Sequence, residues 1–276
     1  MSSDEERSIR KQRIVLARRV RAFGWGGLGI ILLLGVYALL SSEQSANSRG
    51  NFPPLNEVWT EFLGNSPYYV SNAGWTALAA FLGLLLGASF GLLMGLVAGI
   101  SNRAYLLLTP LAVWLKATPI IALSPFFALF LVGKETGLAA VSAAAICFFP
   151  VYVNVSFGLR GKSSPELEYV LSLRPSNVEV LKLIQFPRAI GYAIAGLRTA
   201  STLAVVGATV GEFMGASQGV GILVINAQHQ SAVSKLLVAI LIAGLIGVSF
   251  YVATAAVGHV VTKRYFPSVA SDLGSA

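Results

Sequence analysis

The sequence predicts an all-α, polytopic membrane protein with about six transmembrane helices and one large cytoplasmic loop. Its 276 residues are 55% hydrophobic and only 12% charged, whereas soluble domains carry about 25% charged residues. Six apolar runs are long enough to cross a bilayer, and the basic residues gather in alternate loops between them. Composition, run length and charge placement therefore indicate a protein whose surroundings are lipid.

The predicted spans follow from length, because a helix needs roughly 20 apolar residues to cross the hydrocarbon core. Seven of the 20 basic residues lie between Arg7 and Arg21, directly before the first run. That run could also belong to a cleaved signal peptide, but it is long for one and further membrane segments follow, so a retained helix is favoured. The six predicted spans are residues 23–41, 74–100, 105–132, 137–158, 190–212 and 236–261.

Charge placement also predicts orientation. The loop 159–188 carries five Lys or Arg residues, so the positive-inside rule places it in the cytoplasm together with both termini. We therefore expect a multi-pass protein of the cell inner membrane. The predicted parts are a basic arm (1–22), the first helix (23–41), an extracytoplasmic segment (42–73) with an amphipathic stretch at 55–64, a five-helix core (74–265) and a cytoplasmic tail (266–276).

The second span contains five glycines spaced four residues apart. Such spacing places them on nearly one face of a helix, where the missing side chains let another helix approach closely. Fixed helix packing is the favoured interpretation, and a sliding contact in a moving transporter is the alternative. The five are Gly83, Gly87, Gly91, Gly95 and Gly99.

Several motifs resemble catalytic ones without their context. Residues 87–91 and 215–219 match the G-x-S-x-G nucleophile pattern, which needs a strand–turn–helix that neither region predicts. The "GKSS" at Gly161 lacks the earlier glycine of a phosphate-binding loop, because position 156 is Ser. The lone Cys147 excludes an intrachain disulfide. We expect no catalytic residues, metal ligands or cofactor, so energy must come from a partner or an ion gradient.

The polar loop "GKSSPELEYVLSLRPSNVEVLKLIQFPR" resembles the cytoplasmic loop of the integral-membrane subunits of ABC importers. That family carries E-A-A, three residues, G, nine residues and I-x-L-P. Glu168, Ile184 and Pro187 match it in register, whereas Arg174 stands at the usual glycine. Further stretches, including "KATPIIALSPFFALFLVG" and "VVGATVGEFMGASQGVGILV", are similar to permeases for nitrate, sulfonates, taurine and pyrimidine precursors over residues 53–265.

The resemblance implies two short coupling helices, about 165–173 and 175–184, that meet at Arg174 and dock on an ATPase. Pro175 is suited to the first position of the second helix. Val178, Leu181 and Ile184 would form an apolar ridge on this helix. A charged rim would be formed by Arg174, Glu179 and Lys182.

The implied function is that of the permease subunit of an ATP-driven importer, without catalysis of its own. Its partners would be two ATP-binding cassette subunits, a second permease copy in a homodimer, and an extracytoplasmic solute-binding protein. The solute would be an organic anion such as a sulfonate, or a pyrimidine-type precursor. The alternative is a secondary transporter driven by an ion gradient, which would be expected to show intramembrane carboxylates or an inverted repeat.

Candidate pathway residues lie inside the third, fourth and fifth spans. Lys116 and Arg198 lie roughly 15–20 Å into their helices at 1.5 Å per residue, and a buried cation usually faces a cavity or an anion. Alternatively, both side chains extend towards the cytoplasm. Thr118, Ser124 and Asn154 are polar candidates that could equally pack between helices. The prolines expected to interrupt these spans are Pro110, Pro119, Pro125 and Pro150.

Overall fold

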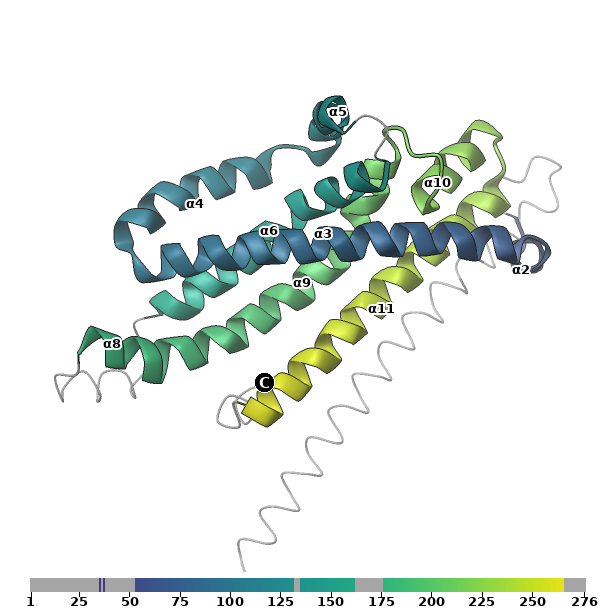
Figure 1. Cartoon of the computed structure of the whole chain (residues 1–276). Coiled ribbons are helices and arrows are strands. Elements are labelled where there is room, and N and C mark those ends of the chain that lie inside the picture. Colours follow the sequence, from purple (N-terminus) through teal and green to yellow (C-terminus); the bar gives the residue numbers. More distant parts are fainter. Residues whose placement is uncertain (1–34, 36, 38–52, 132–134, 162–175, 266–276) are drawn as a thin grey trace, which may run out of the picture. The chain divides into compact units, whose positions relative to one another are not determined.

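The computed structural model describes residues 35, 37, 53–131, 135–161 and 176–265, in which every regular element is a helix (Figure 1). Four helices are long and apolar enough to cross a membrane, and a bent helix pair supplies a fifth span if it crosses as one. The predicted all-α, polytopic fold is confirmed. The predicted first span at 23–41 lies outside the described residues except for positions 35 and 37, as do the arm at 1–22 and the tail at 266–276.

The chain divides into two units, Met1–Glu61 and Phe62–Ala276. Helix α2 (Leu55–Gly64) crosses their boundary and coincides with the amphipathic stretch expected there. It begins directly after Pro53 and Pro54. Proline has no backbone N–H to donate to an earlier carbonyl, so the helix does not continue through these residues towards the amino terminus. The remaining helices belong to the second unit, which is called the bundle below.

Two long helices of the bundle, α3 (Ser66–Ile100) and α6 (Glu135–Arg160), pack through the glycine series. A methyl group placed on Gly87 would lie 2.6 Å from the Ala144 carbonyl oxygen, and one on Gly95 would lie 2.8 Å from Val155 Cβ. All five glycines of the series face α6 in this way. The absent side chains let the two backbones come closer than any larger residue would allow.

A third long helix, α9 (Phe186–Glu212), packs on another side of α6 and also uses small residues. A methyl group on Gly196 would lie 2.8 Å from the Pro150 carbonyl oxygen, and one on Gly211 would lie 2.6 Å from the Ala139 Cα. Helix α6 is therefore held between α3 and α9, and more than half of its most apolar stretch is buried. The central packing of the bundle is thus a sandwich of three helices.

The predicted third span is a bent pair, α4 (Asn102–Ala117) and α5 (Ile120–Phe130), whose axes differ by 96°. The break falls at Thr118 and Pro119, where the proline restricts the preceding residue to extended geometry. Pro110 and Pro125 lie inside α4 and α5, and Pro150 lies inside α6. The prediction that these prolines interrupt their spans is therefore confirmed for Pro119 and wrong for the other three, because α4, α5 and α6 continue through them.

The segment before α9 is continuous with it. It comprises α8 (Asn177–Val180) and a π-helical turn, η1 (Leu181–Gln185), which leads directly into Phe186. The prediction that a separate helix ends at residue 184 is therefore wrong, because the helix continues into α9. The wide turn precedes Pro187, whose ring would otherwise clash with the carbonyl four residues earlier, at Leu183.

Two helices complete the bundle, α10 (Val220–His229) and α11 (Val233–Tyr265). The stretch 214–235, which separates the fifth and sixth predicted spans, thus contains a helix. Helix α11 contacts α9, but little of the apolar stretch of α11 is buried. Figure 1 shows that α8, the ends of α3 and α6 and the start of α4 lie at one end of the bundle, called the α8 end, and that α10 lies at the other, called the α10 end.

Candidate functional site

A cavity of about 590 Å³ opens where α4 breaks from α5, about midway along α6 and α9. Lys116 is the one charged residue among those that line it, and its Nζ lies 4.4 Å from the centre of the Phe149 ring. This distance is within the range of a cation–π contact, which holds the ammonium over the ring. The site is thus a mostly apolar cavity with a single positive charge.

Further polar groups of the cavity come from the end of α4 and from two other helices, α6 and α9. Thr118 ends α4, and its hydroxyl donates to the Trp114 carbonyl oxygen at 3.1 Å. Asn154 of α6 donates through Nδ2 to the Pro150 carbonyl oxygen at 2.8 Å, and Thr199 of α9 also lines the space. A few polar groups within apolar walls are the usual composition of a small-molecule site. The structure therefore brings together three of the five residues proposed for a pathway: Lys116, Thr118 and Asn154.

The other two proposed residues lie elsewhere. Ser124 is fully buried between α5 and α6, where its hydroxyl lies 3.3 Å from that of Ser142. Arg198 is half-buried on α9 and reaches towards α11, with Nη2 3.5 Å from where a methyl group on Gly258 would lie. Its Nε is buried and makes no hydrogen bond within the described part of the chain. Neither residue lines the cavity.

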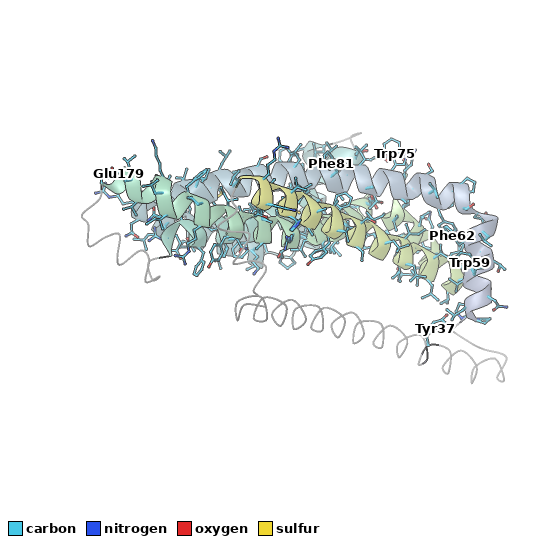
Figure 2. The ribbon with its side chains drawn as sticks, turned by 90° about the horizontal axis from the view of Figure 1, so that it is seen from below. Tyr37, Trp59, Phe62, Trp75, Phe81 and Glu179 are labelled. Carbon is cyan, nitrogen blue, oxygen red and sulfur yellow. The ribbon has the colours of Figure 1, made fainter. Side chains whose placement is uncertain are left out.

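The described part of the proposed coupling segment, residues 176–188, lies at the α8 end, where Glu179 is labelled in Figure 2. Glu179 closes a capping box: its Oε2 accepts hydrogen bonds from the backbone N and the hydroxyl of Ser176, both at 2.8 Å. The Ser176 hydroxyl in turn accepts from the Glu179 N–H at 3.3 Å. The "SNVE" sequence is the signal for this cap, and it starts the helix at Asn177.

The exposed apolar residues of this segment differ from the predicted ridge. Leu181 is half-buried and packs against the bundle core, and Ile184 is also half-buried. Val178 is 57% exposed, as expected, while Leu183 is 73% and Phe186 is 49% exposed. The π-helical turn adds a residue to one turn, and it thereby changes which residues share a face. Glu168, Arg174 and Pro175 lie outside the described residues, and Lys182 is exposed.

A buried polar network at the α10 end was not anticipated. Glu212 is 2% exposed and accepts hydrogen bonds at 2.7 Å from the Thr76 hydroxyl and from the Gly221 N–H. Thr76 accepts from the Val220 N–H at 2.7 Å, and Asn72 Oδ1 accepts from the Gly219 N–H at 2.8 Å. Side chains of α3 and α9 thus satisfy the first backbone donors of α10.

Comparison with known proteins agrees with this arrangement. The family model described as "Binding-protein-dependent transport system inner membrane component" matches residues 87–266. An aliphatic sulfonates transport permease protein of Bacillus subtilis is 33% identical over 61% of this chain and 60% of its own length. An ABC transporter permease protein of Haemophilus influenzae is 30% identical over 80% of this chain and 91% of its own.

A formylaminopyrimidine transport permease protein of Halalkalibacterium halodurans is 31% identical over 51% of this chain and 56% of its own length. The chain thus spans about three fifths of the Bacillus relative and nearly all of the Haemophilus one. The family model covers more than half of the chain, including the cavity and the coupling segment. This protein belongs to the family of binding-protein-dependent transport system inner membrane components, the permease subunits of ABC importers.

Proposed function

We propose that the chain forms a solute pathway through the membrane, with the cavity at the α4–α5 break as its central site. The observation that carries this proposal is the cavity itself, because it lies midway along the spanning helices and is lined by polar groups from α4, α6 and α9. A helix break at membrane depth is tolerated where it lines such a space. The permease supplies the path, and partner ATPases supply the energy.

The proposed solute is a small organic anion. Lys116 carries the one charge among the described residues that line the cavity, and its side chain is exposed. A cation that faces a space at membrane depth favours a negatively charged ligand. The Phe149 ring also lines the cavity and adds apolar surface beside the ammonium for the rest of the solute. A sulfonate fits both features. A pyrimidine-type precursor is the second candidate, since its ring could stack on Phe149, and one relative is named for such a compound.

The proposed ATPase-docking surface is the exposed part of α8, η1 and the start of α9. Val178, Leu183 and Phe186 provide apolar contact area, and Lys182 provides a charge at its edge. An exposed apolar helix face of this kind fits a groove on a partner. Two copies of the chain, two ATPases and an extracytoplasmic binding protein would complete the importer.

Uptake into proteoliposomes tests the function and the solute together. The complex purified from its own membrane is reconstituted with ATP, and the probes are labelled methanesulfonate and formylaminopyrimidine. We expect ATP-dependent uptake of methanesulfonate, with a loss of about tenfold for Lys116→Gln, which corresponds to ~1.4 kcal/mol. Lys116→Arg keeps the charge and should keep most of the uptake.

The control is Lys263→Gln, which removes an exposed lysine from the last turn of α11. Equal methanesulfonate uptake by Lys116→Gln and wild type would show that the cavity is not the path of this anion. Uptake that persists without ATP and stops with an ionophore would favour the secondary transporter instead.

The proposed orientation places the α8 end in the cytoplasm, with both termini on the same side. The single cysteine, Cys147, is fully buried, so new cysteines report their own accessibility. An impermeant maleimide should label Gln218→Cys in intact spheroplasts and Lys263→Cys only after lysis. The reverse pattern would invert the proposed topology.

A further inference from the structure

Arg160, the last residue of α6, binds the connection between α3 and α4. Its Nη1 donates to the Ala98 carbonyl oxygen at 3.2 Å, and its Nη2 donates to Asn102 Oδ1 at 2.5 Å. The guanidinium carbon also lies 4.0 Å from the centre of the Tyr105 ring. A planar arginine can make both hydrogen bonds and the ring contact at once, which lysine cannot. Arg160 therefore ties α6 to the last turn of α3 and the first turn of α4.

Arg188, near the start of α9, binds Gly161, the residue that follows Arg160. Its Nη1 donates to the Gly161 carbonyl oxygen at 2.9 Å, and its guanidinium lies 5.8 Å from the Tyr192 ring centre. A methyl group on residue 161 would lie 2.5 Å from Arg188 Nη2, so the guanidinium lies directly against the backbone at Gly161. We call Arg160, Gly161 and Arg188, with the acceptor Asn102, the arginine joint.

The joint connects the proposed docking surface to the cavity. Arg188 lies two residues beyond Phe186, and the docking surface leads into α9 without a break. On the other side, α4 has 16 residues, which extend roughly 24 Å at 1.5 Å per residue. This helix begins at Asn102 in the joint and ends beside Lys116 and Thr118 in the cavity.

Helix α4 packs less closely against its neighbours than α3, α6 and α9 pack against one another. The contacts among α3, α6 and α9 include several close approaches at glycines, whereas much of α4 is exposed. Leu106, Leu107 and Trp114 are each about two thirds exposed or more. A displacement applied at the first turn of α4 can therefore move it relative to the three packed helices, as in a shear motion.

We propose that Arg160 is a positioning residue that transmits movement of the docking surface, through the arginine joint, to α4 and the cavity. This inference rests on the proposed function, because the movement would originate in the ATPases. Arg160 does not touch the solute; it acts through Asn102 and α4. Its loss would leave ATP hydrolysis running without the matching change in the cavity.

The test needs no knowledge of the solute. A cysteine at Thr118→Cys reports on the cavity, and its rate of reaction with a water-soluble methanethiosulfonate is measured in the purified complex. The rate is compared without nucleotide and with ATP plus vanadate. Because the native Cys147 is buried, the complex without Thr118→Cys supplies the background.

We expect nucleotide to change the labelling rate in the otherwise wild-type complex. Arg160→Gln should abolish this nucleotide-dependent difference while ATP hydrolysis and subunit composition persist. Asn102→Ala should do the same, and Asn102→Asp should retain the difference because it keeps an acceptor. The Arg160→Gln and Asn102→Ala changes together should be no worse than either alone, as expected of one interaction.

The matched control is Arg103→Gln, which removes an exposed arginine from the first turn of the same helix and should leave the difference intact. If Arg160→Gln fails to assemble, Asn102→Ala decides the question. A nucleotide-dependent difference that survives in Arg160→Gln or Asn102→Ala overturns the joint. No difference in the wild-type background would instead overturn the proposed function, and the joint with it.

Discussion

Glu212 illustrates how an acidic side chain in an apolar region can be satisfied by hydrogen bonds. Both of its carboxylate oxygens accept hydrogen bonds, from Thr76 and from the Gly221 N–H. At the same end, Glu135 accepts from the backbone N and hydroxyl of Ser217, both at 2.6 Å. An ion-coupled carrier would use intramembrane carboxylates to bind its coupling ion. Both carboxylates are thus occupied by hydrogen bonds that hold the α10 end together.

The Glu212 network gives a prediction at this scale. Thr76→Val keeps the size of the side chain but leaves the Val220 N–H without its acceptor, and a buried unpaired donor costs about 1–3 kcal/mol. We expect a lower midpoint of thermal unfolding in detergent. The matched control is Thr202→Val, because the Thr202 hydroxyl donates only to the Thr199 carbonyl of its own helix. Equal midpoints for the two variants would contradict the importance of the network.

At the scale of the elements, periodicity and run length predicted most helices correctly. The amphipathic stretch 55–64 is α2, the glycine series packs α3 on α6, and Pro119 marks the bend between α4 and α5. The helix α10 was not predictable, because its first turn is stabilised by Asn72, Thr76 and Glu212 from distant parts of the chain. Local sequence around its glycines gives no sign of those partners.

The candidate site was predictable in part for a similar reason. Lys116, Thr118 and Asn154 were identified by type, and the structure places all three on one cavity. Arg198 was chosen on the same grounds, but its neighbour Thr199 faces the cavity instead. Depth along a helix follows from counting residues, whereas the direction of a side chain depends on how the helix is rotated against its neighbours.

The close packing of α3 on α6 gives a prediction for the helices. Gly87→Ala would place a methyl group 2.6 Å from the Ala144 carbonyl oxygen, and such overpacking typically costs about 1–3 kcal/mol. The matched control is Gly74→Ala on the same helix, where a methyl group meets nothing within 4 Å. We expect Gly87→Ala to unfold at lower temperature in detergent and Gly74→Ala to be unchanged or slightly stabilised. A stable Gly87→Ala variant would indicate that the two helices can separate at little cost.

The bundle as a whole separates three tasks along its length. The α10 end is held by buried hydrogen bonds, the middle contains the cavity, and the α8 end exposes the apolar surface proposed for the ATPase. The three packed helices give these regions a fixed frame, and α4 connects the α8 end to the cavity. This division is what a permease subunit needs if energy is supplied at one end and used in the middle.

Native mass spectrometry of the chain, purified gently from its own membrane, tests the central claim most directly. We expect two copies of the chain with two ATPase subunits. Leu183→Asp, which places a charge on the exposed docking surface, should lose the ATPases but keep the permease pair. Wild-type chains that carry no ATPase, or a Leu183→Asp variant that retains both, would contradict the claim that this surface connects the pathway to ATP hydrolysis.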